Sequence, residues 1–243
     1  MAQNIYDDES FFAGYSTLPR SVQGLGGAPE WSTLRNLLPS TAERRIVDLG
    51  CGFGWFCRWA VENGAASVLG IDLSERMLSR ARADTRAGNV VYEQQDLDRL
   101  ALAPAAFDVA YSALTLHYLT DLSHFLGALA GALVPGGVFV FSVEHPIFTA
   151  PTNPAFVAAD DGTVVWPLDG YLAEGERVTE WFAPGVIKQH RTIATYVSAL
   201  IAAAFAIDDL VEWGPTAEQI AAVPDWAAER ERPPFLLIRA HRQ

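Results

Sequence analysis

The residues whose types and spacing allow chemistry are concentrated in the stretch 45–55, which reads RIVDLGCGFGW. A short apolar run ends on a carboxylate, Asp48, and glycine then occupies every second position of a loop, at Gly50, Gly52 and Gly54. Such a loop has no Cβ atoms to keep a ligand from the backbone, and a helix start offers free N–H groups. The pattern predicts a strand, loop and helix that cradle a nucleotide-like ligand.

The glycine spacing departs from the dinucleotide fingerprint G-x-G-x-x-G. The third glycine of that fingerprint would stand at position 55, which holds Trp55, and the glycine lies one residue earlier at Gly54. Asp48 would also repel the phosphates of a dinucleotide. The loop therefore favours a phosphate-free ligand that is cationic or rich in hydrogen-bond donors.

The run DLGCGFG at 48–54 matches the form D-hydrophobic-G-x-G-x-G, and here the chain resembles the class I S-adenosylmethionine (SAM) methyltransferases. Among these it is similar to the type 11, ubiquinone-biosynthesis-like group that acts on small molecules. The resemblance implies SAM as cofactor, S-adenosylhomocysteine as product, and methyl transfer to a small acceptor. It also implies cofactor contacts from the loop residues Asp48, Gly50, Cys51 and Gly52.

A second carboxylate, Asp72, ends the next predicted strand, 67–72. A carboxylate at this point of a βαβ unit can accept hydrogen bonds from ribose hydroxyls. The alternative is a charge that only complements the start of the following helix, which Ser74 is expected to cap.

Further cofactor contacts follow from the resemblance alone. It implies that an acid, Asp96 or alternatively Asp98, receives the exocyclic amine of adenine. The remaining residues that it places beside the cofactor are Leu73, Met77, Leu97, Ser112 and Leu114.

Two segments are expected to cover this site. The first, 1–40, is expected to form two helices, over 9–18 and 28–38, and in related methyltransferases such a segment acts as a lid. Tyr15 and Arg20 are its candidates for the methionine end of the cofactor; the alternative is that these helices only pack on the sheet edge.

The second segment, 146–189, is too long for an ordinary connection and is rich in aromatic residues. We expect a small antiparallel cap there, with strands over 163–166 and 177–182. Its aromatic side chains predict an apolar or aromatic acceptor, unless they only bury one another.

Two histidines border the cap, and either has an ordinary pKa suited to a general base. His145 follows the fifth predicted strand, and His190 lies where the chain returns from the cap. The alternatives are a structural histidine for His145 and a helix-start residue for His190. His117 is expected to be a packed, hydrogen-bonded side chain.

The elements that must position these residues alternate between strand and helix, which predicts an α/β, doubly wound fold. The resemblance implies a Rossmann-like, mostly parallel seven-stranded sheet in the order 3-2-1-4-5-7-6, its last strand antiparallel. Residues 1–243 are expected to form a single domain that includes both covers.

Composition excludes several classes of function. The formal net charge of −12 argues against nucleic acid and anionic membrane surfaces as partners. No apolar stretch approaches a membrane span, no His/Cys cluster predicts a metal site, and two cysteines without a signal peptide predict a cytoplasmic protein. A small molecule is the expected partner, and the chain is a monomer or homodimer. Two alternatives stay open: a non-catalytic SAM-binding protein and a nicotinamide-dependent oxidoreductase.

Overall fold

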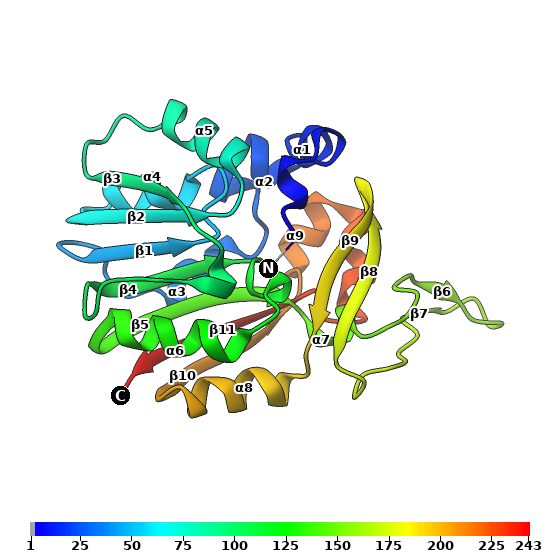
Figure 1. The fold of residues 1–243 in the computed structure, drawn as a ribbon. Helices are drawn as coiled ribbons and strands as arrows, with labels where there is room; N and C mark the ends of the chain where they lie inside the picture. Colours follow the sequence, from blue (N-terminus) through cyan, green and yellow to red (C-terminus); the bar gives the residue numbers. More distant parts are fainter. Residues whose placement is uncertain (1–2) are drawn as a thin grey trace.

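A seven-stranded sheet forms the centre of the computed structural model, which describes residues 3–243 (Figure 1). The strand order is β3-β2-β1-β4-β5-β11-β10, and neighbours are parallel except that β11 is antiparallel to both β5 and β10. The predicted doubly wound sheet, with its seventh strand inserted antiparallel between the fifth and the sixth, is confirmed. The strands are β1 (Arg45–Leu49), β2 (Ser67–Asp72), β3 (Val90–Gln94), β4 (Phe107–Ala113), β5 (Leu133–Glu144), β10 (Phe205–Trp213) and β11 (Phe235–Arg242).

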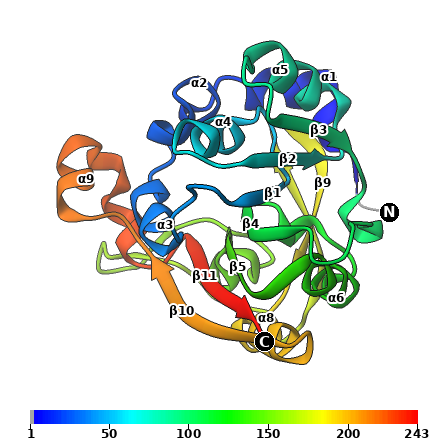
Figure 2. The same ribbon diagram turned by 90° about the vertical axis from the view of Figure 1, so that its left-hand side faces the viewer.

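Helices cover both faces of this sheet (Figure 2). One face carries α3 (Trp31–Leu37), α4 (Trp55–Glu62) and α5 (Glu75–Asp84), and the other carries α6 (Leu122–Ala132) and α8 (Ile193–Ala202). The side chains of Ser74 and Asp121 accept backbone N–H groups in the first turns of α5 and α6, as predicted for capping residues. Each helix layer therefore has its own hydrophobic core against the sheet.

Alternation along β1 sends successive side chains to opposite cores. Ile46 packs with the α3–α4–α5 layer, and Val47 packs with the α6–α8 layer. Asp48 consequently lies on the α4 side of the sheet, where it is buried next to Cys57. The same strand thus supplies core residues to both layers and a carboxylate beneath the glycine loop.

The N-terminal segment differs in detail from the prediction. Its elements are η1 (Ile5–Asp7), α1 (Glu9–Tyr15), α2 (Pro19–Val22) and η2 (Gly24–Gly27), followed by α3. The helix expected over 9–18 ends at Tyr15, because Pro19 restricts the preceding backbone and begins a separate helix. The expected second helix begins at Trp31, three residues later than predicted.

The insertion after β5 contains α7 (Pro146–Thr149) and two separate hairpins. These are β6 (Val157–Ala158) with β7 (Val164–Val165), and β8 (Gly175–Trp181) with β9 (Ala183–His190). Antiparallel strands are present as predicted, but the runs 163–166 and 177–182 pair with closer partners rather than with each other. The β6–β7 arm projects from the body, whereas β8 and β9 lie against it (Figure 1).

Short helical elements complete the chain. They are η3 (Leu97–Arg99), η4 (Leu116–Tyr118), α9 (Ala217–Ala222) and η5 (Pro224–Arg230), the last two forming a lobe between β10 and β11. Among residues 3–243, no helix combines the length and the apolar character needed to cross a membrane.

A matched pair of leucines tests where the core lies. Leu126 on α6 is 1% exposed, whereas Leu172 in the insertion is 86% exposed. We expect Leu126→Ala to lower the free energy of unfolding by about 2–5 kcal/mol through a buried cavity, and Leu172→Ala to change it by less than about 0.5 kcal/mol. Urea unfolding followed by circular dichroism measures both, and equal losses would contradict the assigned core.

Candidate active site

The glycine loop 50–54 connects β1 to α4 in a conformation that requires glycine. Gly50 has φ +83°, and a Cβ there would lie 2.1 Å from Thr115 Oγ1. Gly52 has φ +52°, but a Cβ there would meet no atom within 4 Å, so its outer side is open. The loop therefore leaves backbone exposed to a ligand at Gly52 while it packs tightly at Gly50.

Asp72 at the end of β2 contacts this loop directly. Its Oδ2 accepts the N–H of Gly52 at 2.8 Å, and its Oδ1 accepts the N–H of Ser74 at 2.9 Å. Burial raises the pKa of Asp72, although the N–H groups of Ser74 and Gly52 oppose that effect. The carboxylate thus fixes the spacing between the loop and the start of α5.

A cavity of about 480 Å³ opens at the carboxyl ends of the parallel strands, where ligands of open α/β sheets bind. Leu114, which follows β4 with the unusual φ of +52°, contributes to its wall. The cavity brings together ten of the predicted cofactor-binding residues: Tyr15, Arg20, Gly50, Gly52, Asp72, Leu73, Met77, Asp96, Leu97 and Leu114.

Asp96 gives a test of fit for an adenine base. Its Oδ1 accepts the N–H of Asp98 at 3.0 Å and caps η3. Its Oδ2 is buried and has no hydrogen-bond partner among the residues that the structure describes. An unpaired carboxylate oxygen in this wall is suited to an amine donor, as SAM would provide.

Three of the predicted cofactor contacts lie outside this lining. Ser112 donates its hydroxyl to the Leu49 carbonyl at 2.6 Å and is fully buried within the sheet. Asp48 and Cys51 instead border a smaller neighbouring cavity of about 90 Å³. Their contact with a cofactor therefore stays a prediction.

Asp48 lies in an apolar environment beneath the loop. Its Oδ2 accepts a hydrogen bond from Cys57 Sγ at 3.2 Å, and burial raises its pKa to about 7. Desolvation also raises the pKa of Cys57, to about 11, so both sulfur and carboxyl favour their neutral forms.

The N-terminal segment and the hairpin β8–β9 form a joint roof over the cavity. Phe11 is fully buried and packs edge-on against Trp181 at 5.4 Å between ring centroids. Gln3 accepts the N–H of Ile187 on β9 at 3.0 Å, and Asp7 accepts the hydroxyl of Ser74 at 2.5 Å. The segment therefore links the cofactor end of the cavity to the hairpin, and its action as a mobile lid stays a prediction.

Tyr15 and Arg20 occupy the underside of this roof. The Arg20 guanidinium makes two hydrogen bonds to Glu30, at 3.1 and 3.2 Å. Glu30 is 1% exposed, so the pair is held rigidly at the cavity wall. Arg20 therefore contributes to the cavity wall the N–H groups that are not bonded to Glu30, and Tyr15 contributes an aromatic ring.

The two predicted general bases lie outside the cavity lining. The ring of His145 is 2.9 Å from Glu212 through Nε2 and accepts the N–H of Ile147 through Nδ1. His190 uses its two nitrogens for Thr149 Oγ1, at 2.8 Å, and the Tyr171 carbonyl, at 2.9 Å. Both rings are fully buried and tie the insertion to the body, so the geometry does not place them at the cavity.

Among the other polar side chains that line the cavity, three that the sequence did not indicate as functional form a cluster. Glu144 ends β5, Lys188 lies on β9, and His117 lies on η4. Lys188 Nζ donates to Glu144 Oε1 at 2.5 Å, and the Glu144 N–H donates to His117 Nδ1 at 3.3 Å. The only signal for Glu144 was its place at a strand end beside His145, and Lys188 carried no signal because the β9 strand itself was not predicted.

The charges in this cluster are set by burial and by neighbours. Burial lowers the pKa of His117 to about 4, so its ring is neutral at neutral pH. Burial alone would raise the pKa of Glu144, but its electrostatic interactions with His117 and with the Lys188 ammonium outweigh burial and hold this pKa below its ordinary range. Glu144 is therefore an ionised carboxylate facing a lysine, and its Oε2 is buried without a partner among residues 3–243.

The fold and this cavity define a Rossmann-like protein that binds a phosphate-free nucleoside cofactor at the carboxyl edge of its sheet. Comparison with known proteins supports and narrows that class. The profile of the family described as "Methyltransferase domain" matches residues 47–141. A crystal structure of a SAM-dependent methyltransferase from Mesorhizobium loti is 53% identical, with a TM-score of 0.88 over 90% of this chain and 100% of that one.

Two further proteins agree. A structure described as a putative SAM-dependent methyltransferase from Listeria monocytogenes is 39% identical, with a TM-score of 0.81 over 89% of this chain and 99% of that one. A malonyl-[acyl-carrier protein] O-methyltransferase from Enterobacter lignolyticus is 36% identical over 43% of this chain and 41% of that protein. The chain belongs to the SAM-dependent methyltransferases, and SAM is its cofactor. This assignment replaces the nicotinamide and non-catalytic alternatives.

Replacement of Asp72 tests its role at the cofactor. Hydrogen bonds to a charged group contribute about 1.5–3 kcal/mol each, so Asp72→Ala is expected to weaken S-adenosylhomocysteine binding roughly 10- to 100-fold. Isothermal titration calorimetry measures the change. Asp84→Ala, at the distant end of α5, is the control and should bind as the native protein does; equal affinities for all three proteins would contradict the role of Asp72.

The pKa of Asp48 predicts a dependence of stability on pH. Its folded-state pKa of about 7 lies above its ordinary value of 3.8, so the folded protein holds the proton more tightly than the unfolded chain. The resulting stabilisation is complete below about pH 4 and is lost as the pH rises through 7, at about 1.4 kcal/mol for each pH unit between these two pKa values. In urea unfolding, Asp48→Asn should lose less stability than the native protein between pH 4 and 7, and parallel pH profiles would argue against a buried, protonated Asp48.

Proposed function

We propose that this methyltransferase modifies a small acceptor that binds at the Glu144–Lys188 end of the cavity and carries an O–H or N–H group. The observation that carries the proposal is the buried, unpaired Oε2 of Glu144. This buried carboxylate oxygen lacks a donor, and a hydroxyl or amine of the acceptor would supply one.

The walls around this oxygen support an acceptor with an apolar or aromatic body. Trp181, Phe148 and Tyr118 line the same cavity. Lys188 Nζ lies 5.1 Å from the centroid of the Trp181 ring, so the ammonium is held between the ring and Glu144. A flat or apolar group fits between such rings, with few polar groups to fix its orientation.

A carboxylate acceptor suits the cluster less well. One relative named above methylates malonyl-[acyl-carrier protein], whose malonyl group carries an acid. In this chain the Lys188 ammonium is already paired with Glu144, and a second carboxylate would add like charge beside the first. The electrostatics of the site therefore favour a neutral or cationic acceptor.

The cavity residues would align the nucleophile rather than transform it. Bound SAM would supply a methyl carbon on a cationic sulfur. The sulfur departs as a neutral thioether, so this leaving group needs no acid. Glu144 accepts the acceptor's O–H or N–H, which directs a lone pair away from the carboxylate, and it takes up the proton that becomes acidic when the new bond forms. Lys188 keeps Glu144 ionised, and the aromatic roof excludes water.

Substitution at Glu144 tests this role. With a labelled methyl group on SAM and a panel of phenols, alcohols, amines and carboxylic acids, we expect label transfer to the donor-bearing members. Glu144→Gln should lower that turnover by roughly 10²- to 10⁴-fold and leave S-adenosylhomocysteine affinity unchanged, since the cofactor contacts lie elsewhere.

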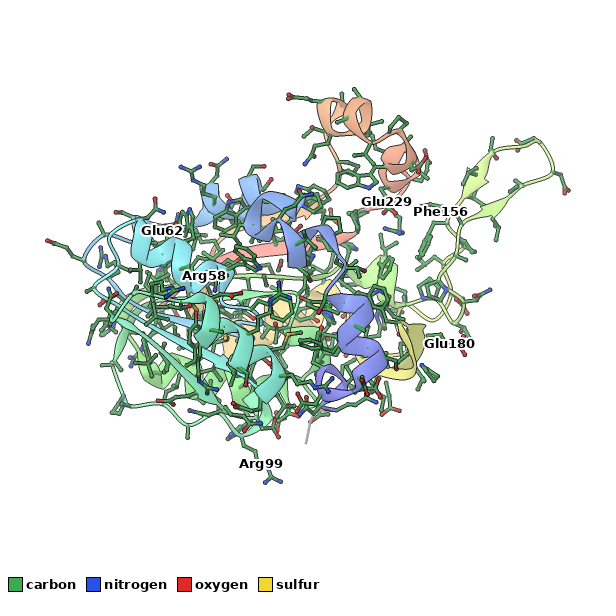
Figure 3. All side chains as sticks on the ribbon, turned by 90° about the horizontal axis from the view of Figure 1, so that it is seen from above. Arg58, Glu62, Arg99, Phe156, Glu180 and Glu229 are labelled. Carbon is green, nitrogen blue, oxygen red and sulfur yellow. The ribbon has the colours of Figure 1, made fainter. Side chains whose placement is uncertain are left out.

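Glu180 provides the matched control, because it lines the same cavity on the exposed side of β8 (Figure 3). Glu180→Gln should retain turnover close to that of the native protein. Transfer to carboxylic acids alone, or equal turnover in both variants, would refute the proposed acceptor class.

A further inference from the structure

A second cavity, of about 260 Å³, adjoins the active-site cavity. Ten residues line it, and seven of these are aromatic or proline. The lining consists of Pro29, Glu144, Phe148, Trp213, Pro215, Trp226, Glu229, Arg232, Pro234 and Phe235. Most of this wall consists of rigid rings, so the side chains of the lining cannot easily move to fill the cavity.

The two cavities share a wall. Glu144, Phe148 and Phe235 line both of them. Glu144, which we place at the reacting group of the acceptor, thus lies at the boundary between the two cavities. Predicted cofactor-binding residues line one cavity, and the aromatic and proline rings line the other. A molecule held at Glu144 therefore lies next to the second cavity, with Phe148 and Phe235 as neighbours.

Two of the three charged residues that line the second cavity, Arg232 and Glu229, are paired with each other. Arg232 Nη1 donates to Glu229 Oε2 at 2.8 Å, and the guanidinium lies 4.5 Å from the ring centroid of Phe148 and 4.1 Å from that of Trp166. Glu229 lies on the lobe that faces the β6–β7 arm (Figure 3). With two carboxylates against one guanidinium in its lining, the cavity disfavours an anion and favours an uncharged group.

We propose that the second cavity is a subsite for the apolar tail of the methyl acceptor, whose O–H or N–H head is held at Glu144. The inference rests on the proposed function and narrows it: the acceptor is an amphipathic alcohol, phenol or amine with a chain or ring of several carbons beyond its head. An apolar tail gains affinity there because it leaves water for a cavity lined by rings.

A series of 4-alkylphenols, from 4-methyl to 4-pentyl, tests this subsite in protein saturated with S-adenosylhomocysteine. Each added methylene buried in the cavity should tighten binding roughly fourfold, as measured by calorimetry. Trp226, which covers the cavity from η5, is the residue to change. Trp226→Ala should flatten this dependence on chain length, because the tail then remains in contact with water.

Trp59→Ala is the matched control, since Trp59 is also partly buried and lines neither cavity. It should retain the native dependence on chain length. The proposed subsite would be overturned if affinity did not depend on chain length in the native protein. It would also be overturned if this dependence were as steep in Trp226→Ala as in the native protein.

A parallel series of 4-alkylanisoles separates the tail from the head, because an anisole has no O–H for Glu144. If the subsite and the proposed function both hold, anisoles bind more weakly than phenols and show the same dependence on chain length. Anisoles that bind as tightly as phenols, with that dependence intact, would overturn the donor role at Glu144 and leave the tail subsite standing.

Discussion

The Ile71 carbonyl at the end of β2 is the point on which the cofactor end of the molecule depends. It accepts two consecutive N–H groups of the glycine loop, from Gly50 at 2.8 Å and from Cys51 at 2.9 Å. Asp72, the next residue, takes the N–H of Gly52. Three successive loop N–H groups are thus bound to two successive residues of β2, and this places α4, the cavity floor and the start of α5 in fixed relation.

The sequence was sufficient to predict this end because its chemistry is local. Glycines at every second position allow the left-handed backbone that this loop adopts, and an acid at the end of the adjacent parallel strand must lie beside them. The alternation of strands and helices predicted the doubly wound class, and the resemblance to the methyltransferases supplied the strand order.

The end of the cavity that we propose for the acceptor could not be predicted in the same way, because its residues meet only through tertiary structure. Glu144 and Lys188 are 44 positions apart, and their contact depends on the hairpin β8–β9, in which β9 was not expected. His145 and His190 had the residue type of a base and bordered the cap, but their ring nitrogens are used to hold the insertion in place. Residue type alone does not decide between these roles, because a buried histidine is suited equally to catalysis and to hydrogen bonding within the fold.

The shared wall of Phe148 and Phe235 has a consequence for how such an enzyme diversifies. The floor at the cofactor is built from strand ends and a loop whose glycines tolerate little change. The second cavity is walled by the ends of β5, β10 and β11 and, for the larger part, by Pro29, the segment between β10 and β11 and the first residues of the insertion. Connecting segments accept substitutions and changes of length more readily than sheet strands do. If the second cavity holds the acceptor's tail as we propose, substitutions in these connecting segments can change the acceptor while the glycine loop and the strand ends retain methyl transfer.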